Sequence, residues 1–193
     1  MLEWIHVLEE WLIEYGLISL IIVSFTESSF FPIPPDVLLL PMSIAEPDRA
    51  MFYALITTAM SVLGALLGWY IGKKFGRPIL RYFVSEEKIE KVDVYFQKYG
   101  ALAILIAGFT PIPYKIFTIF SGISNIKLRT LVIWSIIGRG LRFFSEAYIV
   151  ITLGPKAIPF IEQNFTLITI IGGATILVLY IIYILLRKRK KQK

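Results

Sequence analysis

The sequence has no cysteine and a single histidine, and these absences exclude several kinds of site. Without cysteine the chain has neither a disulfide bond nor a thiolate ligand for a metal ion. The one histidine, His6, lies among acidic residues near the N-terminus, so a histidine-based catalytic triad or metal centre has nothing to build on. We therefore expect no metal site and no cofactor.

Charged residues are also scarce, at 18% of the 193 residues, whereas hydrophobic residues make up 56%. This composition is typical of an integral membrane protein, with a single membrane domain over residues 1–193 and no separate soluble domain. The net charge of +6 comes from basic residues that cluster at segment ends, where membrane topology places them. We therefore expect no nucleic-acid partner.

The first apolar region, residues 16–46, lacks an uninterrupted helix of membrane-spanning length. Its run before the first proline, residues 17–31, is shorter than the ~20 residues that a spanning helix needs. Pro32, Pro34 and Pro35 then remove three backbone donors. Because such backbone is tolerated at membrane depth only where protein buries it or water reaches it, we predict a re-entrant hairpin with the prolines at its tip.

The same proline pattern returns later in the chain. Residues 32–45 read PIPPDVLLLPMSIA and residues 111–124 read PIPYKIFTIFSGIS, so Pro-Ile-Pro recurs at one register and Asp36 is matched by Lys115. Corresponding proline-interrupted hydrophobic segments in two halves of a chain point to a transporter binding site. We therefore predict a second re-entrant hairpin.

Charge and hydropathy divide the chain into eight expected segments. They are an interfacial amphipathic helix at 1–15, hairpin one at 16–46, a span at 50–72, a basic cytoplasmic loop at 73–99, hairpin two at 100–125 with Pro111 and Pro113 at its tip, spans at 128–153 and 165–186, and a basic cytoplasmic tail at 187–193.

The positions of the basic segments set the expected topology. The basic loop and the basic tail lie on the cytoplasmic side, so an even number of crossings separates them and hairpin two does not cross. One crossing before the loop leaves the N-terminus outside, and the two hairpins enter from opposite sides. The predicted fold is an all-α polytopic membrane protein, an inverted repeat with two facing re-entrant helical hairpins plus spanning helices.

Six ionisable residues are expected at membrane depth, three acidic and three basic. Each would cost roughly 2.5–3.5 kcal/mol at the centre of a lipid-facing helix, so we expect them to face the protein interior. We predict that they form a site for substrate and protons, with Glu27 as the proton carrier and Arg139 as the arginine left available for a phosphate. The six are Glu27, Asp36, Lys115, Arg139, Arg142 and Glu146.

Structural roles remain open for most of these groups. Asp36 would stabilise a helix N-terminus directly after a proline, and the arginines would form a salt-bridge scaffold with the carboxylates. Arg142 and Glu146 are one helical turn apart and so predict an ion pair. Lys115 is better explained by a nearby anion, either Asp36 or a ligand. Glycines at every fourth position predict close helix packing; they are Gly64, Gly68, Gly72 and Gly76.

At these residues the chain resembles the DedA family, also described by its VTT or SNARE-associated domain. The resemblance covers about residues 16–153 and is carried by Glu27 with the Pro-Ile-Pro-Pro-Asp tip, the glycine-spaced helix, the second proline-rich hairpin at 108–122, and Gly-Arg-Gly-Leu-Arg-Phe at 138–143. It implies two facing hairpins and the movement of lipids between leaflets, including polyprenyl phosphate and phosphatidylethanolamine, with proton coupling.

The resemblance also bears on individual residues. Glu27 and Asp36 match the acidic pair of the family, and Arg139 and Arg142 resemble its arginines. Many members carry arginines around the second proline tip, where residues 108–115 of this chain hold one lysine and no arginine. The chain therefore resembles a divergent branch.

The leading functional hypothesis is a membrane lipid translocase rather than an enzyme. Its expected partners are polyprenyl phosphate or a phospholipid, with protons and a second copy of the chain as further candidates. The alternative is a non-transporting membrane assembly or homeostasis factor whose buried charges are structural. A lipid enzyme comes third, since the sequence shows no histidine at membrane depth and no nucleophile–base pair.

Overall fold

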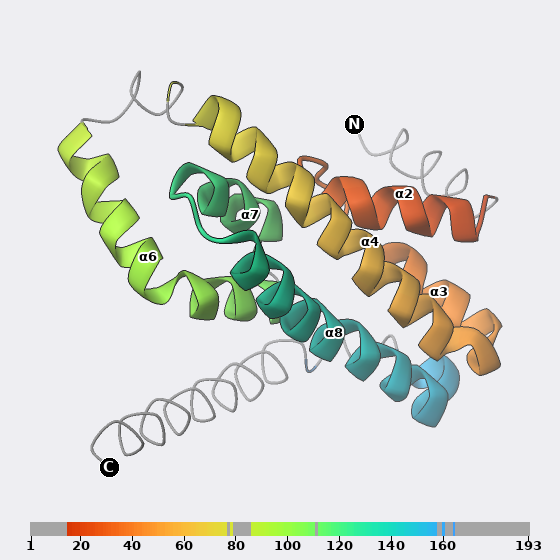
Figure 1. Cartoon of the computed structure of the whole chain (residues 1–193). Helices are drawn as coiled ribbons and strands as arrows, with labels where there is room; N and C mark the ends of the chain where they lie inside the picture. The colour runs from red at the N-terminus through yellow and green to blue at the C-terminus, as the bar shows by residue number, and fades with distance from the viewer. Residues whose placement is uncertain are drawn as a thin grey trace, which may run out of the picture.

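The structure is a computed structural model that describes residues 15–76, 78, 86–110, 112–157, 160 and 164 (Figure 1). All regular elements within these residues are helical, which confirms the all-α fold class for this part of the chain. They are α2 (Leu17–Glu27), α3 (Asp36–Ala45), the short 3-10 helix η1 (Pro47–Arg49), α4 (Ala50–Ile71), the π-helical turn η2 (Gly72–Gly76), α6 (Glu86–Phe109), α7 (Tyr114–Ile123), α8 (Leu128–Leu153) and the 3-10 helix η3 (Gly154–Lys156).

Some of the expected features lie outside the described residues. They are residues 1–14 of the expected amphipathic helix, Pro111, the span at 165–186 and the basic tail at 187–193.

Two long helices, α4 and α8, cross the middle of the molecule side by side in opposite directions (Figure 1). Their bounds agree with the spans expected at 50–72 and 128–153. Within the described residues, one helical stretch, Pro47–Gly76, is long and apolar enough to cross a membrane. The other apolar helical stretches are shorter, at Leu17–Glu27, Asp36–Ala45, Phe96–Phe109 and Tyr114–Ile123.

In both copies of the repeated motif, a proline-containing loop comes directly before a short helix. α2 ends at Glu27, and α3 begins at Asp36 directly after Pro35. In the second copy α7 begins directly after Pro113, and α3 and α7 are each ten residues long. The shared Pro-Ile-Pro pattern therefore gives the same local structure twice, a loop followed by a short helix.

Helix α6 differs from the expected division at Gly100. It begins at Glu86 and continues without a break to Phe109. The boundary expected between a basic loop at 73–99 and hairpin two is thus not an element boundary. The reason is local: no proline occurs between residues 86 and 109, and a single glycine does not end a helix.

The glycine stripe runs from α4 into η2 and lies where other helices approach the backbone most closely. A Cβ atom added at Gly64 would lie 2.0 Å from the Phe25 carbonyl oxygen of α2. One added at Gly72 would lie 1.9 Å from the Ile119 carbonyl oxygen of α7. Gly68 and Gly76 likewise face α7. A single stripe therefore brings a helix of each proline motif against α4, and this fixes where the two loops stand relative to each other.

Two apolar clusters flank the region between the loops. The first joins α2, α3, α4 and α8 through Leu20, Val23, Leu38, Leu39, Ala50, Tyr53, Ala54, Phe143 and Ala147. The second joins α4, α6, α7 and α8 through Ala65, Ile104, Ala107, Tyr114, Ile126 and Leu131. Because α4 and α8 contribute to both clusters, they hold the two halves of the molecule together.

Candidate functional site

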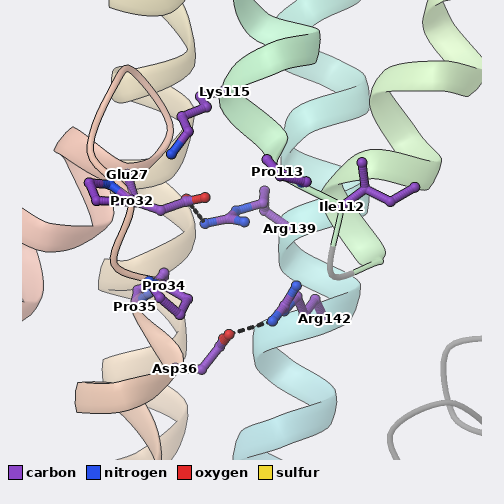
Figure 2. Close-up of a pocket in the computed structure, with 10 residues that line it drawn as sticks. All are labelled: Glu27, Pro32, Pro34, Pro35, Asp36, Ile112, Pro113, Lys115, Arg139 and Arg142. Atoms are coloured by element: carbon purple, nitrogen blue, oxygen red, sulfur yellow. Dashed lines mark hydrogen bonds and ion pairs between the residues drawn. The ribbon is translucent and has the colours of Figure 1, made fainter. Parts of the chain in front are cut away.

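A cavity of about 250 Å³ lies between the two proline loops (Figure 2). Its walls come from the loop between α2 and α3, the loop before α7, and one face of α8. The lining residues are Glu27, Pro32, Pro34, Pro35, Asp36, Ile112, Pro113, Lys115, Arg139 and Arg142. Five of the six ionisable residues predicted for the site line this cavity, and Glu146 contacts Arg142 beside it.

Arg139 is the most buried of these charged residues, with 2% of its surface exposed. Its Nη2 donates to Glu27 Oε2 over 2.7 Å and to Ser61 Oγ over 3.0 Å. The guanidinium also lies over the rings of Tyr114 and Phe143, at 5.0 and 4.5 Å from their centroids. The expectation that Arg139 is the less committed arginine is therefore wrong, because α2 places Glu27 directly opposite it.

Arg142 connects three parts of the chain through three different nitrogen atoms. Nη2 donates to Asp36 Oδ2 at the start of α3, and Nε donates to Glu146 Oε1 over 3.1 Å. Nη1 donates to the Thr110 carbonyl oxygen, at the end of α6, over 3.0 Å. The ion pair with Glu146 follows from the one-turn spacing, whereas the contacts with Asp36 and Thr110 come from packing between helices.

Lys115 makes a different kind of contact. Its Nζ donates to the Phe31 carbonyl oxygen over 2.9 Å, and no ion pair joins it to Asp36, whose carboxylate is bound by Arg142. Thr118, one turn further along α7, donates to the Ser28 carbonyl oxygen over 2.9 Å. Of the two anions considered for Lys115, Asp36 or a ligand, Asp36 is therefore not its partner. Instead α7 holds backbone carbonyls of the first loop, where no helical hydrogen bond competes for them.

Three buried polar atoms in and beside the cavity have no hydrogen-bond partner within the described residues. They are Asp36 Oδ1, Arg139 Nε and Glu146 Oε2. Buried polar groups without partners are few in native proteins and point to an unassigned water, ion or functional role. In the part of the chain that the structure describes, no three histidine, cysteine or carboxylate side chains converge as metal ligands.

Four further residues contact the site, although no sequence pattern predicted them there: Ser28, Ser61, Tyr114 and Thr118. A signal existed for Ser61, which lies one turn before Gly64 and so shares the glycine face of α4. The Ser28 and Thr118 contact depends on how α7 packs against the first loop, and local spacing does not encode it. Tyr114 bonds Ser135 of α8 through its hydroxyl group.

Comparison with known families shows which family the chain belongs to. A model of the VTT domain matches residues 33–152, which include the end of the first proline loop, all of the second, α4 and nearly all of α8. The chain belongs to the VTT domain family. This confirms the DedA resemblance drawn from the sequence. Relatives described as membrane proteins support a location in a membrane.

Relatives of this VTT protein occur in several bacteria. A protein of Haemophilus influenzae, described as uncharacterized, is 34% identical over 86% of each chain. The Bacillus subtilis membrane protein YbfM is 25% identical over 77% of this chain and 94% of its own. Undecaprenyl phosphate transporter A of Staphylococcus aureus is 23% identical over 69% of this chain and 71% of its own. No solved structure matches the chain.

Proposed function

We propose that this protein is a lipid translocase that moves a phosphate-bearing headgroup through the cavity between the two proline loops. Polyprenyl phosphate and phospholipids both carry such a headgroup. The observation that carries the proposal is the charge arrangement of the cavity. Both arginines bind carboxylates, whereas the Lys115 ammonium lies in the same cavity and, among the described residues, bonds only a backbone carbonyl.

The position of Lys115 favours an anionic ligand. It lies in the first turn of α7, where a cation opposes the helix dipole. A half-buried ammonium at that position is unfavourable without an anion to compensate it. A phosphate that enters the cavity would supply that anion and would form charge-assisted hydrogen bonds with Nζ.

The size of the cavity agrees with a headgroup rather than a whole lipid. Pockets that enclose drug-sized ligands usually have volumes of roughly 300–1,000 Å³. At about 250 Å³, this cavity has room for a phosphate and its water but not for an isoprenoid or acyl chain. The tail would therefore stay in the bilayer while the headgroup passes between the loops.

The proposal includes the predicted topology. The two proline motifs would be re-entrant hairpins of an inverted repeat, entering from opposite sides, with the N-terminus outside and the C-terminus cytoplasmic. Two features support this: the apolar helices flanking both loops are shorter than a span, and the loop-plus-helix unit is repeated. Carbonyl groups of the first loop that lack a helical hydrogen bond accept hydrogen bonds from side chains of α7. Irregular backbone at membrane depth needs such partners.

The test is transport of fluorescent polyprenyl phosphate and fluorescent phospholipid in proteoliposomes. Lys115→Gln should lower the rate about tenfold or more, because a hydrogen bond to a charged group contributes about 1.5–3 kcal/mol. Lys115→Arg, which keeps the charge, should retain more activity. Lys127→Gln is the matched control, since Lys127 is exposed outside the cavity. A Lys115→Gln variant that transports both lipids at the wild-type rate would overturn the proposed role.

One observation favours the alternative of a non-transporting assembly factor. Both arginines at the cavity already have carboxylate partners, as a purely structural charge network would require. A wild-type protein that moves no lipid in vesicles, yet restores the envelope of a deletion strain, would support that alternative. Headgroup turnover in the same vesicles would instead indicate a lipid enzyme.

A further inference from the structure

A group of two carboxylates and one guanidinium lies at the edge of the cavity. Arg142 donates to one oxygen of Asp36 and to one oxygen of Glu146. Its third nitrogen, Nη1, donates to the Thr110 carbonyl oxygen. The remaining carboxylate oxygens, Asp36 Oδ1 and Glu146 Oε2, are buried and have no partner within the described residues. Glu146 is 8% exposed, so solvent offers its unpaired oxygen little compensation.

The charges of this group do not balance when both carboxyl groups are ionised. Two negative charges then face one positive charge, and the surplus lies where water is largely excluded. An uncompensated buried charge is strongly unfavourable, and two carboxylates that share a site commonly relieve it by sharing one proton. The same oxygens that lack partners would become the donor and acceptor of that proton.

The other ionisable groups around the cavity do not remove the surplus at close range. On α2, Glu27 is engaged by Arg139 of α8 at 2.7 Å, so this pair is neutral by itself. On α7, Lys115 donates to the Phe31 carbonyl and forms no ion pair with Asp36 or Glu146. Among the described residues, α4 and α6 contribute no ionisable side chain to the cavity lining.

We propose that Asp36 and Glu146 together hold one proton between their unpaired oxygens and so form a proton-binding site beside the cavity. The sequence pointed to Glu27 as the proton carrier, but the structure places Glu27 in a balanced ion pair. The protonated carboxyl group donates to its neighbour, and Arg142 then faces a single negative charge.

A link to the transported anion follows, and it rests on the proposed function. Lys115 offsets part of the surplus negative charge from across the cavity. A phosphate bound to Lys115 cancels that contribution and makes the protonated state of the Asp36–Glu146 pair more favourable. Headgroup binding and proton uptake would then occur together.

Infrared spectroscopy of the full-length protein tests the shared proton directly. In a detergent without ester carbonyls, the wild type should show the C=O stretch of a protonated carboxyl group at neutral pH, with a shift in heavy water. The band should disappear in both Glu146→Gln and Asp36→Asn, because each variant leaves one carboxylate paired with Arg142. It should remain in the control Glu46→Gln, because Glu46 is exposed and lies outside the cavity lining.

Three results would overturn the shared proton: no such band in the wild type, a band that survives either Glu146→Gln or Asp36→Asn, or a band that only Glu27→Gln removes. If a variant does not fold, wild-type protein with isotope-labelled carboxyl groups replaces it. A proton shared by Asp36 and Glu146 predicts that the band shifts both with labelled glutamate and with labelled aspartate.

The coupling has its own readout, recorded without transport. At the pH where the wild-type band has lost half its intensity, inorganic phosphate should restore it, and Lys115→Gln should abolish this response. A band indifferent to phosphate would remove the coupling and leave the shared proton in place. Failure of lipid transport alone would remove the proposed function and leave both spectroscopic results standing.

Discussion

Arg139 of α8 donates a 2.7 Å hydrogen bond to Glu27 of α2, although the two residues are 112 positions apart in the sequence. The guanidinium lies over the rings of Tyr114 and Phe143 and also donates to Ser61 of α4. One buried ion pair therefore ties α2 to α8 at the edge of the cavity. Because its guanidinium already binds Glu27, Arg139 is not available to an incoming phosphate.

We expect this pair to be strongly coupled in stability. Glu27→Gln and Arg139→Gln should each lower the free energy of unfolding by about 3–5 kcal/mol, because each leaves the opposite charge buried without its partner. The double variant should be more stable than the sum of the two losses predicts. Thermal unfolding in detergent measures all four proteins, and strictly additive losses would contradict the pairing.

The glycine stripe gives a second prediction with a matched control. Gly64→Ala should destabilise the protein by about 1–3 kcal/mol, because its Cβ would lie 2.0 Å from the Phe25 carbonyl oxygen and force α2 away from α4. Gly140→Ala in α8 should be neutral or stabilising by up to about 1 kcal/mol, since its Cβ would meet only Thr58 Cγ2 at 3.8 Å. Equal effects in unfolding experiments would mean that close approach of α2 does not set the packing.

The topology can be tested by labelling single introduced cysteines. The natural chain has no cysteine, so no other residue of the chain would react with a maleimide as a thiol. Asp48 and Lys156 are exposed, and η1 and the end of α8 lie at the same end of the molecule, whereas Lys74 is exposed at the far end of α4. Asp48→Cys and Lys156→Cys should react with an impermeant maleimide in intact cells. Lys74→Cys should react only after permeabilisation. Labelling of all three from outside would exclude the proposed orientation.

Local patterns in the sequence predicted most of the helical structure. Proline positions predicted the interruptions between α2 and α3 and before α7, since a proline removes a donor wherever it stands. The bounds of α8 followed from its apolar length, and the Arg142–Glu146 pair followed from helical spacing. The continuity of α6 through Gly100 was missed, because polar and apolar halves of one helix resemble two separate segments.

Apolar composition, proline breaks and one-turn spacing are local properties, and they were enough to predict the membrane class and six ionisable residues that lie in or beside one cavity. The resemblance of the motifs predicted the family. The partners of the charged residues depend on contacts between helices that are distant in the sequence. Glu27 bonds Arg139, Asp36 bonds Arg142, and Lys115 reaches a backbone carbonyl, although register had favoured Asp36 with Lys115. The physical reason is that α4 packs against α2 at Gly64 and η2 packs against α7 at Gly72. This packing sets where the two loops lie along α8, and so which side chains can reach each other.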